Sequence, residues 1–371
     1  MKLSPSLVLS SILHRPMRAL VTILAIGLEV ALILLVVGLT RGLIADSGKR
    51  IEGIGADIIL RAPASSYITL STPAAMSIKI AELVSAVPGV RNVAPVITQF
   101  NTQNGLEYLY GIDLNSFDQV SGGFIFLSGT GFQKPTDVIV DDIYANSRKL
   151  KTGDSVTFLN NTFRISGIAE HGKGSRVFLP IQTMQELMGA TGKTSMIFIK
   201  CDSKDKVEPV IAQLKNRLPG YSILPMEVFV SQLSSAISNT SALRYFISFV
   251  TFTAALVGFF VIFLAMYTAI TERTHEIGIL KSLGASKSYV LGVFMREAWF
   301  LCLLGFLWGI ALSYLGELLV KKIFPSLQIT FGLDWMLKTA IIALVSSSLG
   351  AFYPALRAAS QDPIDALAYD L

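Results

Sequence analysis

The stretch Thr271–Glu297, TERTHEIGILKSLGASKSYVLGVFMRE, is a charged segment between two long apolar runs. The preceding run, residues 246–270, has 25 positions without a charge, and the following run, residues 298–316, is again uncharged. A helix of about 20 apolar residues crosses the hydrocarbon core of a bilayer. The stretch therefore predicts a turn, on one side of a membrane, between two spanning helices.

The composition of the whole chain also indicates a membrane protein. Of its 371 residues, 52% are hydrophobic and only 15% are charged, whereas about 25% of a soluble domain is charged. The apolar excess lies in four runs, which predicts four transmembrane helices with a mixed α+β extracytoplasmic domain inserted between helices 1 and 2. The predicted spans are residues 19–40, 246–270, 286–316 and 339–357.

The ends of these spans carry their own signals. Ser286 is a good N-cap residue, so the third helix is expected to begin there and to project from the membrane. Pro354 is expected to end or kink the fourth helix. The segments next to the spans are predicted as an interfacial helix at residues 1–18, a short extracytoplasmic loop at 317–338 and a tail at 358–371.

The insert, residues 41–245, has the composition of an ordinary soluble domain. Residues 77–87 and 207–218 have helical spacing, and the strand-like runs gather between them, which predicts a strand-rich subdomain at about 100–195. Residues 225–244 are expected to lead as a helix into the second span. The predicted strands are Ala56–Leu60, Asn92–Ile97, Leu106–Gly111, Val138–Val140, Ser155–Leu159, Thr162–Ile168 and Met196–Lys200.

Within the opening stretch, residues 271–285 predict a short amphipathic helix from Thr274 to Leu283. Ile277, Leu280 and Leu283 share one face, with Ile279 on its flank, and such a helix can insert into a groove on a partner. An ordinary loop folded on the membrane surface is the alternative that spacing alone leaves open. The remaining predicted contact residues are Glu276 and Lys281 for register, Gly278 for close approach, and Gly284 with Ala285 where the helix stops.

Glu29 is the only charged residue in the first span. A carboxylate inside a membrane is costly and marks a functional position by default. Three interpretations stay open at this point. Glu29 lies on a substrate or proton path, holds a contact between helices through a hydrogen bond, or is protonated and tolerated.

The chain shows no motif for chemistry of its own. Gly189–Thr194, GATGKT, resembles a phosphate loop, but the position five residues before its Gly-Lys pair is Leu187 instead of glycine. The acidic pair Asp141 and Asp142 is expected to be solvated. We therefore expect no catalytic residues, no metal site and no cofactor, and ATP would be bound by another chain. The sequence has no dense basic block, which argues against a nucleic-acid partner.

Several motifs resemble one family. The segment Glu272–Ala285, ERTHEIGILKSLGA, resembles the signature of MacB/FtsX-type ABC transporter permeases of the type VII superfamily, as do Phe294–Ala298 and the C-terminal Pro354–Leu371. The insert motifs VPGVRNVAPVI, LYGIDL and RVFLPIQTMQELM are similar to that family's periplasmic core domain. The FtsX-like permease domain would then cover about residues 246–371.

The resemblance implies a multi-pass protein of the bacterial inner membrane with both termini in the cytoplasm. It implies a permease dimer, homomeric or heteromeric, on two cytoplasmic ATPase subunits that the segment 271–285 would contact. ATP-driven closure would then move the outer domains, which is mechanotransmission. A periplasmic adaptor protein is a further partner that the family allows. Glu29 is not expected from the family pattern, so the resemblance assigns it no role.

Three functions are compatible with parts of this pattern. The first is export or extraction of a substrate at the outer leaflet or periplasm, and the second is a transmembrane signal that regulates a cell-wall hydrolase or a sensor kinase. The third, a membrane-anchored enzyme or adhesin, is disfavoured by the coupling motif and by the missing catalytic constellation. The first two share every motif in the chain, and the sequence does not name the substrate.

Overall fold

The computed structural model describes residues 16–63, 75–101, 107–324 and 327–361. The chain divides into two compact units. We call one the helical unit (Met1–Gly42, Ser241–Ile323 and Ile329–Leu371) and the other the inserted domain (Leu43–Thr240 with Phe324–Gln328). Most of the predicted interfacial helix at 1–18 and most of the tail at 358–371 lie outside the described residues.

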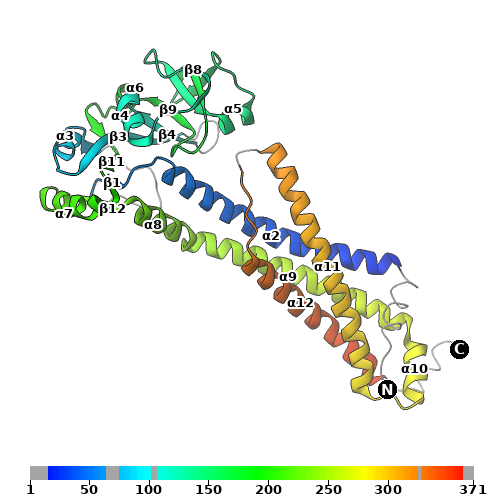
Figure 1. Ribbon diagram of the computed structural model, residues 1–371. Helices are drawn as coiled ribbons and strands as arrows, with labels where there is room; N and C mark the ends of the chain where they lie inside the picture. The colour runs from blue at the N-terminus through cyan, green and yellow to red at the C-terminus, as the bar shows by residue number, and fades with distance from the viewer. Residues whose placement is uncertain (1–15, 64–74, 102–106, 325–326, 362–371) are drawn as a thin grey trace. The chain divides into compact units, whose positions relative to one another are not determined.

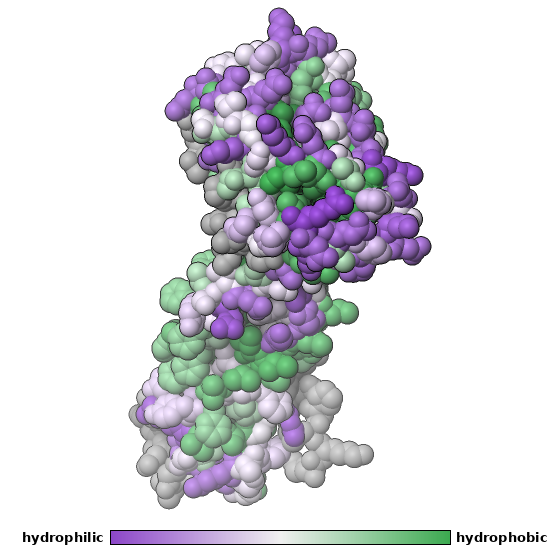
Figure 2. Space-filling view, turned by 90° about the vertical axis from the view of Figure 1, so that its left-hand side faces the viewer, coloured by the Kyte–Doolittle hydropathy of each residue, from purple (hydrophilic) through white to green (hydrophobic). Residues whose placement is uncertain are grey.

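The helical unit contains four helices long and apolar enough to cross a membrane: α2 (Pro16–Glu52), α9 (Ser241–Glu272), α11 (Lys287–Ile323) and α12 (Leu333–Ser360). Figure 1 shows them running alongside one another, with the short α10 (Thr274–Ser282) between α9 and α11. Hydrophobic side chains gather over the middle of this unit on the face seen in Figure 2. The unit therefore presents to its surroundings the apolar surface that a bilayer requires.

Small residues let these helices approach closely. A Cβ added to Gly305 on α11 would lie 2.6 Å from the Cβ of Ile26 on α2, and one added to Gly309 would lie 2.6 Å from the Cβ of Val30. This is the small-xxx-small spacing that brings the backbones of membrane helices together.

Two helix ends differ in how well the sequence predicted them. The cap at Ser286 is confirmed, because its hydroxyl accepts a hydrogen bond from the Tyr289 backbone N–H at 3.2 Å and α11 begins at Lys287. Pro354 does not end the fourth helix, because α12 continues through it to Ser360.

The inserted domain is built on one mixed ten-stranded sheet with strand order β12-β1-β11-β3-β4-β9-β6-β8-β5 and with β7 paired to β8. Strands β4 and β9 are parallel, as are β6 and β8, and the other pairs are antiparallel. The strands of this sheet are β1 (Ile58–Arg61), β3 (Val90–Asn101), β4 (Glu107–Ile112), β5 (Phe126–Gly129), β6 (Asp137–Asp141), β7 (Ser155–Phe158), β8 (Asn161–Ala169), β9 (Val177–Pro180), β11 (Met196–Cys201) and β12 (Ser222–Pro225).

Helices cover this sheet, and side-chain alternation along its strands separates the cores. On β11, Met196 and Phe198 face one buried cluster, whereas Ile197 and Ile199 face another. The last turns of α2 enter the first cluster through Ile51. The remaining elements are α3 (Ile80–Ser85), α4 (Leu114–Ser121), α5 (Asp142–Arg148), α6 (Ile181–Leu187), α7 (Val207–Arg217), α8 (Met226–Ser238), a 3-10 turn (Lys204–Lys206) and a small ladder of β2 (Met76–Ser77) with β10 (Lys193–Thr194).

The structure adds to one expectation about the insert and corrects another. The strands of the predicted strand-rich subdomain at about 100–195 continue one sheet with their neighbours, because β3 pairs with β4 along six residues. Residues 225–244 do not lead unbroken into the second span, because α8 ends at Ser238 and α9 begins at Ser241. The break falls at Asn239 and Thr240, residue types that bond to nearby backbone and so favour helix ends over interiors.

Candidate functional site

The predicted contact helix is present as α10, and its end is a glycine-capped turn. The N–H of Gly284 donates to the carbonyl of Lys281 at 3.0 Å, and the N–H of Ala285 donates to that of Leu280 at 3.0 Å. Gly284 has a φ of 93°, the left-handed conformation that this pair of bonds requires. The turn directs the chain into α11, so α10 is held between the ends of two long helices.

One face of α10 packs inward and is not available to a partner. Ile277 is only 2% exposed and lies in a cluster with Phe294 of α11 and Ala355 of α12. Gly278 beside it is also buried. The prediction that Ile277 and Gly278 contact a partner is therefore wrong, because α10 folds back on its own helical unit with this face.

Lys281 is also engaged within the chain. Its Nζ donates to the backbone carbonyl of Ala359 at 3.1 Å and to that of Gln361, at the end of α12. A lysine at this position satisfies carbonyls that the helix leaves open and complements the negative end of its dipole. Lys281 thus ties α10 to α12, whereas the sequence predicted that it flanks a partner.

The outer face of α10 carries an exposed stripe. Ile279 and Leu280 are each 42% exposed and Leu283 is 80% exposed, and Glu276 is also exposed. These four residues recur at i, i+3, i+4 and i+7, which places them on one side of a helix. We call this set the outer stripe. It keeps three predicted site residues, Glu276, Leu280 and Leu283, and adds Ile279 in place of Ile277.

A cluster of four charged residues lies beside α10, and the sequence did not single it out. Arg18 of α2 contacts Glu272 at 3.1 Å and Glu297 at 4.0 Å, while Arg273 contacts Glu297 at 3.7 Å. Glu297 is only 3% exposed. Removing one partner of a buried ion pair is strongly destabilising because it leaves the other charge uncompensated. This cluster therefore joins the start of α2, the end of α9 and the body of α11.

Glu29 lies inside the helical unit, where three helices meet. It is 4% exposed, and Ser346 of α12 donates a 3.4 Å hydrogen bond to its Oε1. Its Oε2 faces Gly258 of α9, where an added Cβ would come within 1.8 Å. This position is the geometry of a contact between helices, the second of the three interpretations that the sequence left open.

A second charge cluster anchors the last turns of α2 within the inserted domain. Arg176 contacts Asp46 of α2 at 3.2 Å and Asp141 at 3.4 Å, and Arg50 contacts Asp46 at 3.1 Å. With Ile51 in the adjacent apolar core, these ion pairs fix this end of α2 to the sheet. The cluster unites residues from distant parts of the sequence, so spacing could not reveal it.

Asp141 is not the solvated residue that the sequence predicted. It is 1% exposed, and its Oδ1 accepts the Tyr144 backbone N–H at 2.6 Å, which caps α5. Burial raises the pKa of Asp141 to about 6, although Arg176 and the Tyr144 N–H oppose the rise. The neighbouring Asp142 is half-buried and bonds to the Nδ1 of His171 at 3.0 Å. Among the described residues no group of three His, Cys, Asp or Glu side chains is arranged to hold a metal ion.

Comparisons with known proteins match both units. Residues 19–217 match the family described as MacB-like periplasmic core domain, and residues 248–363 match the FtsX-like permease C-terminal family. The chain is 27% identical over 400 residues to the uncharacterized ABC transporter permease YknZ of Bacillus subtilis, covering 98% of each chain.

Longer relatives match over part of their length. The chain is 27% identical over 389 residues to the macrolide export ATP-binding/permease protein MacB of Salmonella paratyphi A, covering 95% of this chain and 58% of that protein. Among solved structures, the periplasmic region of MacB from Actinobacillus actinomycetemcomitans aligns with 52% of this chain and 97% of that one, at 18% identity and a TM-score of 0.38.

Proposed function

Because this chain belongs to the MacB/FtsX-like family of ABC transporter permeases, we propose that it transmits movement from a separate cytoplasmic ATPase to its inserted domain. The family and the four apolar helices make it an inner-membrane protein with an extracytoplasmic domain. The proposal adds that both termini and α10 lie in the cytoplasm. It further adds that two permease copies, identical or different, work on two ATPase subunits.

The outer stripe of α10 is the proposed contact with the ATPase. Three apolar side chains, Ile279, Leu280 and Leu283, stay exposed on a helix whose opposite face is anchored. Leu283 follows Leu280 by three positions and Ile279 by four, the spacing of the anchors with which an amphipathic helix enters a groove on a partner. Glu276 would add register through a charge at the edge of that groove.

The observation that carries the proposal is the continuity of α2. Its 37 residues run without interruption from the charge cluster at Arg18 to the ion pairs of Asp46 and Arg176. A helix anchored at both ends can carry a displacement over its length, about 55 Å at 1.5 Å per residue. We propose that closure of the ATPase displaces α10 and the charge cluster, and that α2 passes this displacement to the inserted domain.

ATP binding is assigned to the partner. MacB is named as a combined ATP-binding/permease protein, and this chain spans 58% of it. In this proposal the permease itself contributes no catalysis and binds no cofactor. Its substrate would be acted on at the outer leaflet or in the periplasm by the moving domains, and a periplasmic adaptor is a compatible further partner.

Co-purification of the ATPase tests the proposed contact. Leu280→Asp places a charge in the centre of the outer stripe and leaves the buried face of α10 unchanged, so the ATPase should be lost. Leu333→Asp is the matched control, because Leu333 is 79% exposed at the other end of α12. The tagged permease would be isolated from its native membrane, and the bound ATPase would be identified by mass spectrometry and ATP hydrolysis.

The expected result is at least a tenfold loss of bound ATPase with Leu280→Asp and no loss with Leu333→Asp, while both variants melt at the wild-type temperature. Equal ATPase recovery from wild type and Leu280→Asp would contradict the assignment of the outer stripe. If Leu280→Asp retains the ATPase but no longer exports any substrate, the proposed position of the contact is wrong, and the family assignment is unaffected.

A further inference from the structure

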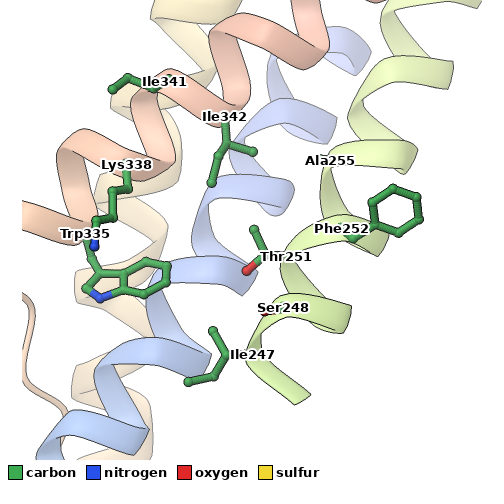
Figure 3. A pocket seen from close by; sticks show the side chains of 9 residues that line it. All are labelled: Ile247, Ser248, Thr251, Phe252, Ala255, Trp335, Lys338, Ile341 and Ile342. Carbon is green, nitrogen blue, oxygen red and sulfur yellow. The ribbon is translucent and has the colours of Figure 1, made fainter. Parts of the chain in front are cut away.

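The first turns of α9 and α12 enclose a groove of about 450 Å³ on the surface of the helical unit (Figure 3). Its wall on α9 includes Ile247, Thr251 and Ala255, and its wall on α12 includes Ile341 and Ile342. Both helices begin at the same end of the groove, because they pack side by side and their lining residues lie within the first half of each. The groove therefore runs from the start of the two helices towards their middle.

One cationic residue lines this groove, and a second lies one helical turn before its α9 wall. Lys338 lines it, with its Nζ 4.9 Å from the centroid of the Trp335 ring. Arg244 is exposed and precedes Ile247 and Ser248 by one turn on the same face of α9. The nearby carboxylate of Asp334 is already held by Arg41 through two 2.7 Å hydrogen bonds.

The position of Trp335 and Lys338 indicates how deep the groove lies. Tryptophan is enriched at membrane interfaces, and lysine near a helix end extends its ammonium group towards the headgroups. From residue 335 to residue 342, α12 descends about 10 Å into the hydrocarbon. At that depth water does not fill an apolar groove, whereas a lipid acyl chain does.

We infer that this groove holds one acyl chain of an anionic phospholipid, whose phosphate is bound by Lys338 and Arg244. The apolar walls would contact the acyl chain, and the two cations would neutralise the negative charge of the headgroup. With the orientation given in the proposed function, this groove lies in the outer leaflet, so its leaflet rests on that proposal. The lipid site itself needs only that the helices cross a membrane.

A second groove provides an internal comparison. It has the same volume, about 450 Å³, and lies between α2 and α11, with Leu24, Leu307 and Trp308 in its lining. No lysine or arginine belongs to that lining. It is expected to accept an acyl chain without preference for the headgroup. Selectivity for an anionic lipid should therefore depend on the α9–α12 groove alone.

Native mass spectrometry of the full-length protein tests this inference. The purified protein would be titrated with phosphatidylglycerol or phosphatidylcholine in detergent, with no nucleotide or ATPase present. Each of Lys338→Gln and Arg244→Gln should weaken phosphatidylglycerol binding about fivefold, the effect of one cation near a lipid phosphate, and leave phosphatidylcholine binding unchanged. Lys322→Gln is the matched control, an exposed cation at the end of α11 outside the groove.

A substitution that fills the groove provides a second test. Ala255→Trp should reduce binding of both lipids, because the indole would occupy the space of the acyl chain. If Lys338→Gln and Lys322→Gln weaken phosphatidylglycerol equally, the headgroup site is wrong. If Ala255→Trp changes neither lipid, or if it instead converts a dimer into monomers, the groove holds no lipid chain. Failure of the ATPase contact at α10 would leave all these results unchanged, so the two proposals fail separately.

Discussion

Ile277 and Leu280 are three positions apart in α10, yet the first is 2% exposed and the second 42%. The sequence placed them on one face because positions i and i+3 are neighbours on a helix. In the structure the inner face is formed by Thr274, Ile277, Gly278 and Lys281, and the boundary with solvent runs between the two residues. A substitution at Ile277 would test folding, whereas one at Leu280 tests docking.

Asp141 predicts a local dependence of stability on pH. Its folded-state pKa, about 6, is above the ordinary 3.8. The unfolded chain therefore releases this proton at lower pH than the folded domain does. The contribution of Asp141 to stability is complete below about pH 4 and is lost as the pH rises through about 6, by at most about 3 kcal/mol.

Asp141→Asn removes this titration and keeps an N-cap residue at the start of α5. The free energy of unfolding of the variant, relative to wild type, should thus rise between pH 4 and pH 7. Hydrogen exchange of residues 137–148 in the full-length protein, compared at each pH, measures the difference. A difference that stays constant across this range would contradict the raised pKa.

Glu29 and Gly258 form a pair whose coupling can be measured. Gly258→Ala alone should lower stability by about 1–3 kcal/mol, because the new methyl group would overlap Oε2. In a Glu29→Ala background the same change should cost much less, since the carboxylate is gone. Thermal melting of the four purified proteins gives the interaction free energy. Equal costs in both backgrounds would show that Glu29 does not hold this contact between helices.

The backbone conformation at the end of α10 limits which residue type can occupy that position. Gly284→Ala should destabilise α10 by about 1 kcal/mol, because alanine resists the left-handed conformation at φ 93°. Gly292→Ala in α11 is the control, since an added Cβ there meets nothing within 4 Å and alanine favours a helix. Hydrogen exchange over residues 274–285 reports both. Faster exchange in Gly292→Ala than in Gly284→Ala would contradict this explanation of the turn.

Elements with a strong periodic pattern were predictable, and several short strands were not. The strand predicted at Met196–Lys200 is β11, whose alternating side chains fill two cores. Strands β5, β9 and β12 were missed, and each of them takes its position from its neighbours in the sheet. The four apolar spans were predicted because a bilayer demands long uncharged runs.

Residues of the candidate site were predictable from the sequence only where their partners lie in the same short segment. Gly284 and Ser286 act locally, through bonds to residues a few positions away, and the sequence identified both. Glu297 and Asp141 acquire their partners from distant segments, Arg18 and Arg176. A charged residue read alone is expected to be solvated, so the burial of these carboxylates could not be inferred before the chain was folded.

For the whole molecule, α2 is the only described helix that belongs to both units. Its first turns are ion-paired to the end of α9 and to α11. In its last turns Asp46 is ion-paired to Arg176, in the segment before β9, and Arg176 in turn contacts Asp141 of β6. In contrast, α9 is separated from α8 by a break at Asn239 and Thr240. In the proposed mechanism, movement would therefore pass between the units through α2 more directly than through α9.

The most direct test is hydrogen exchange of the inserted domain in the purified permease–ATPase complex, with and without a non-hydrolysable ATP analogue. The nucleotide should change exchange in residues 43–54 and 137–148, around the ion pairs of Arg176. This change should be lost in Leu280→Asp and retained in Leu333→Asp. A nucleotide effect confined to the ATPase and α10, or a domain response that persists in Leu280→Asp, would contradict transmission through α2.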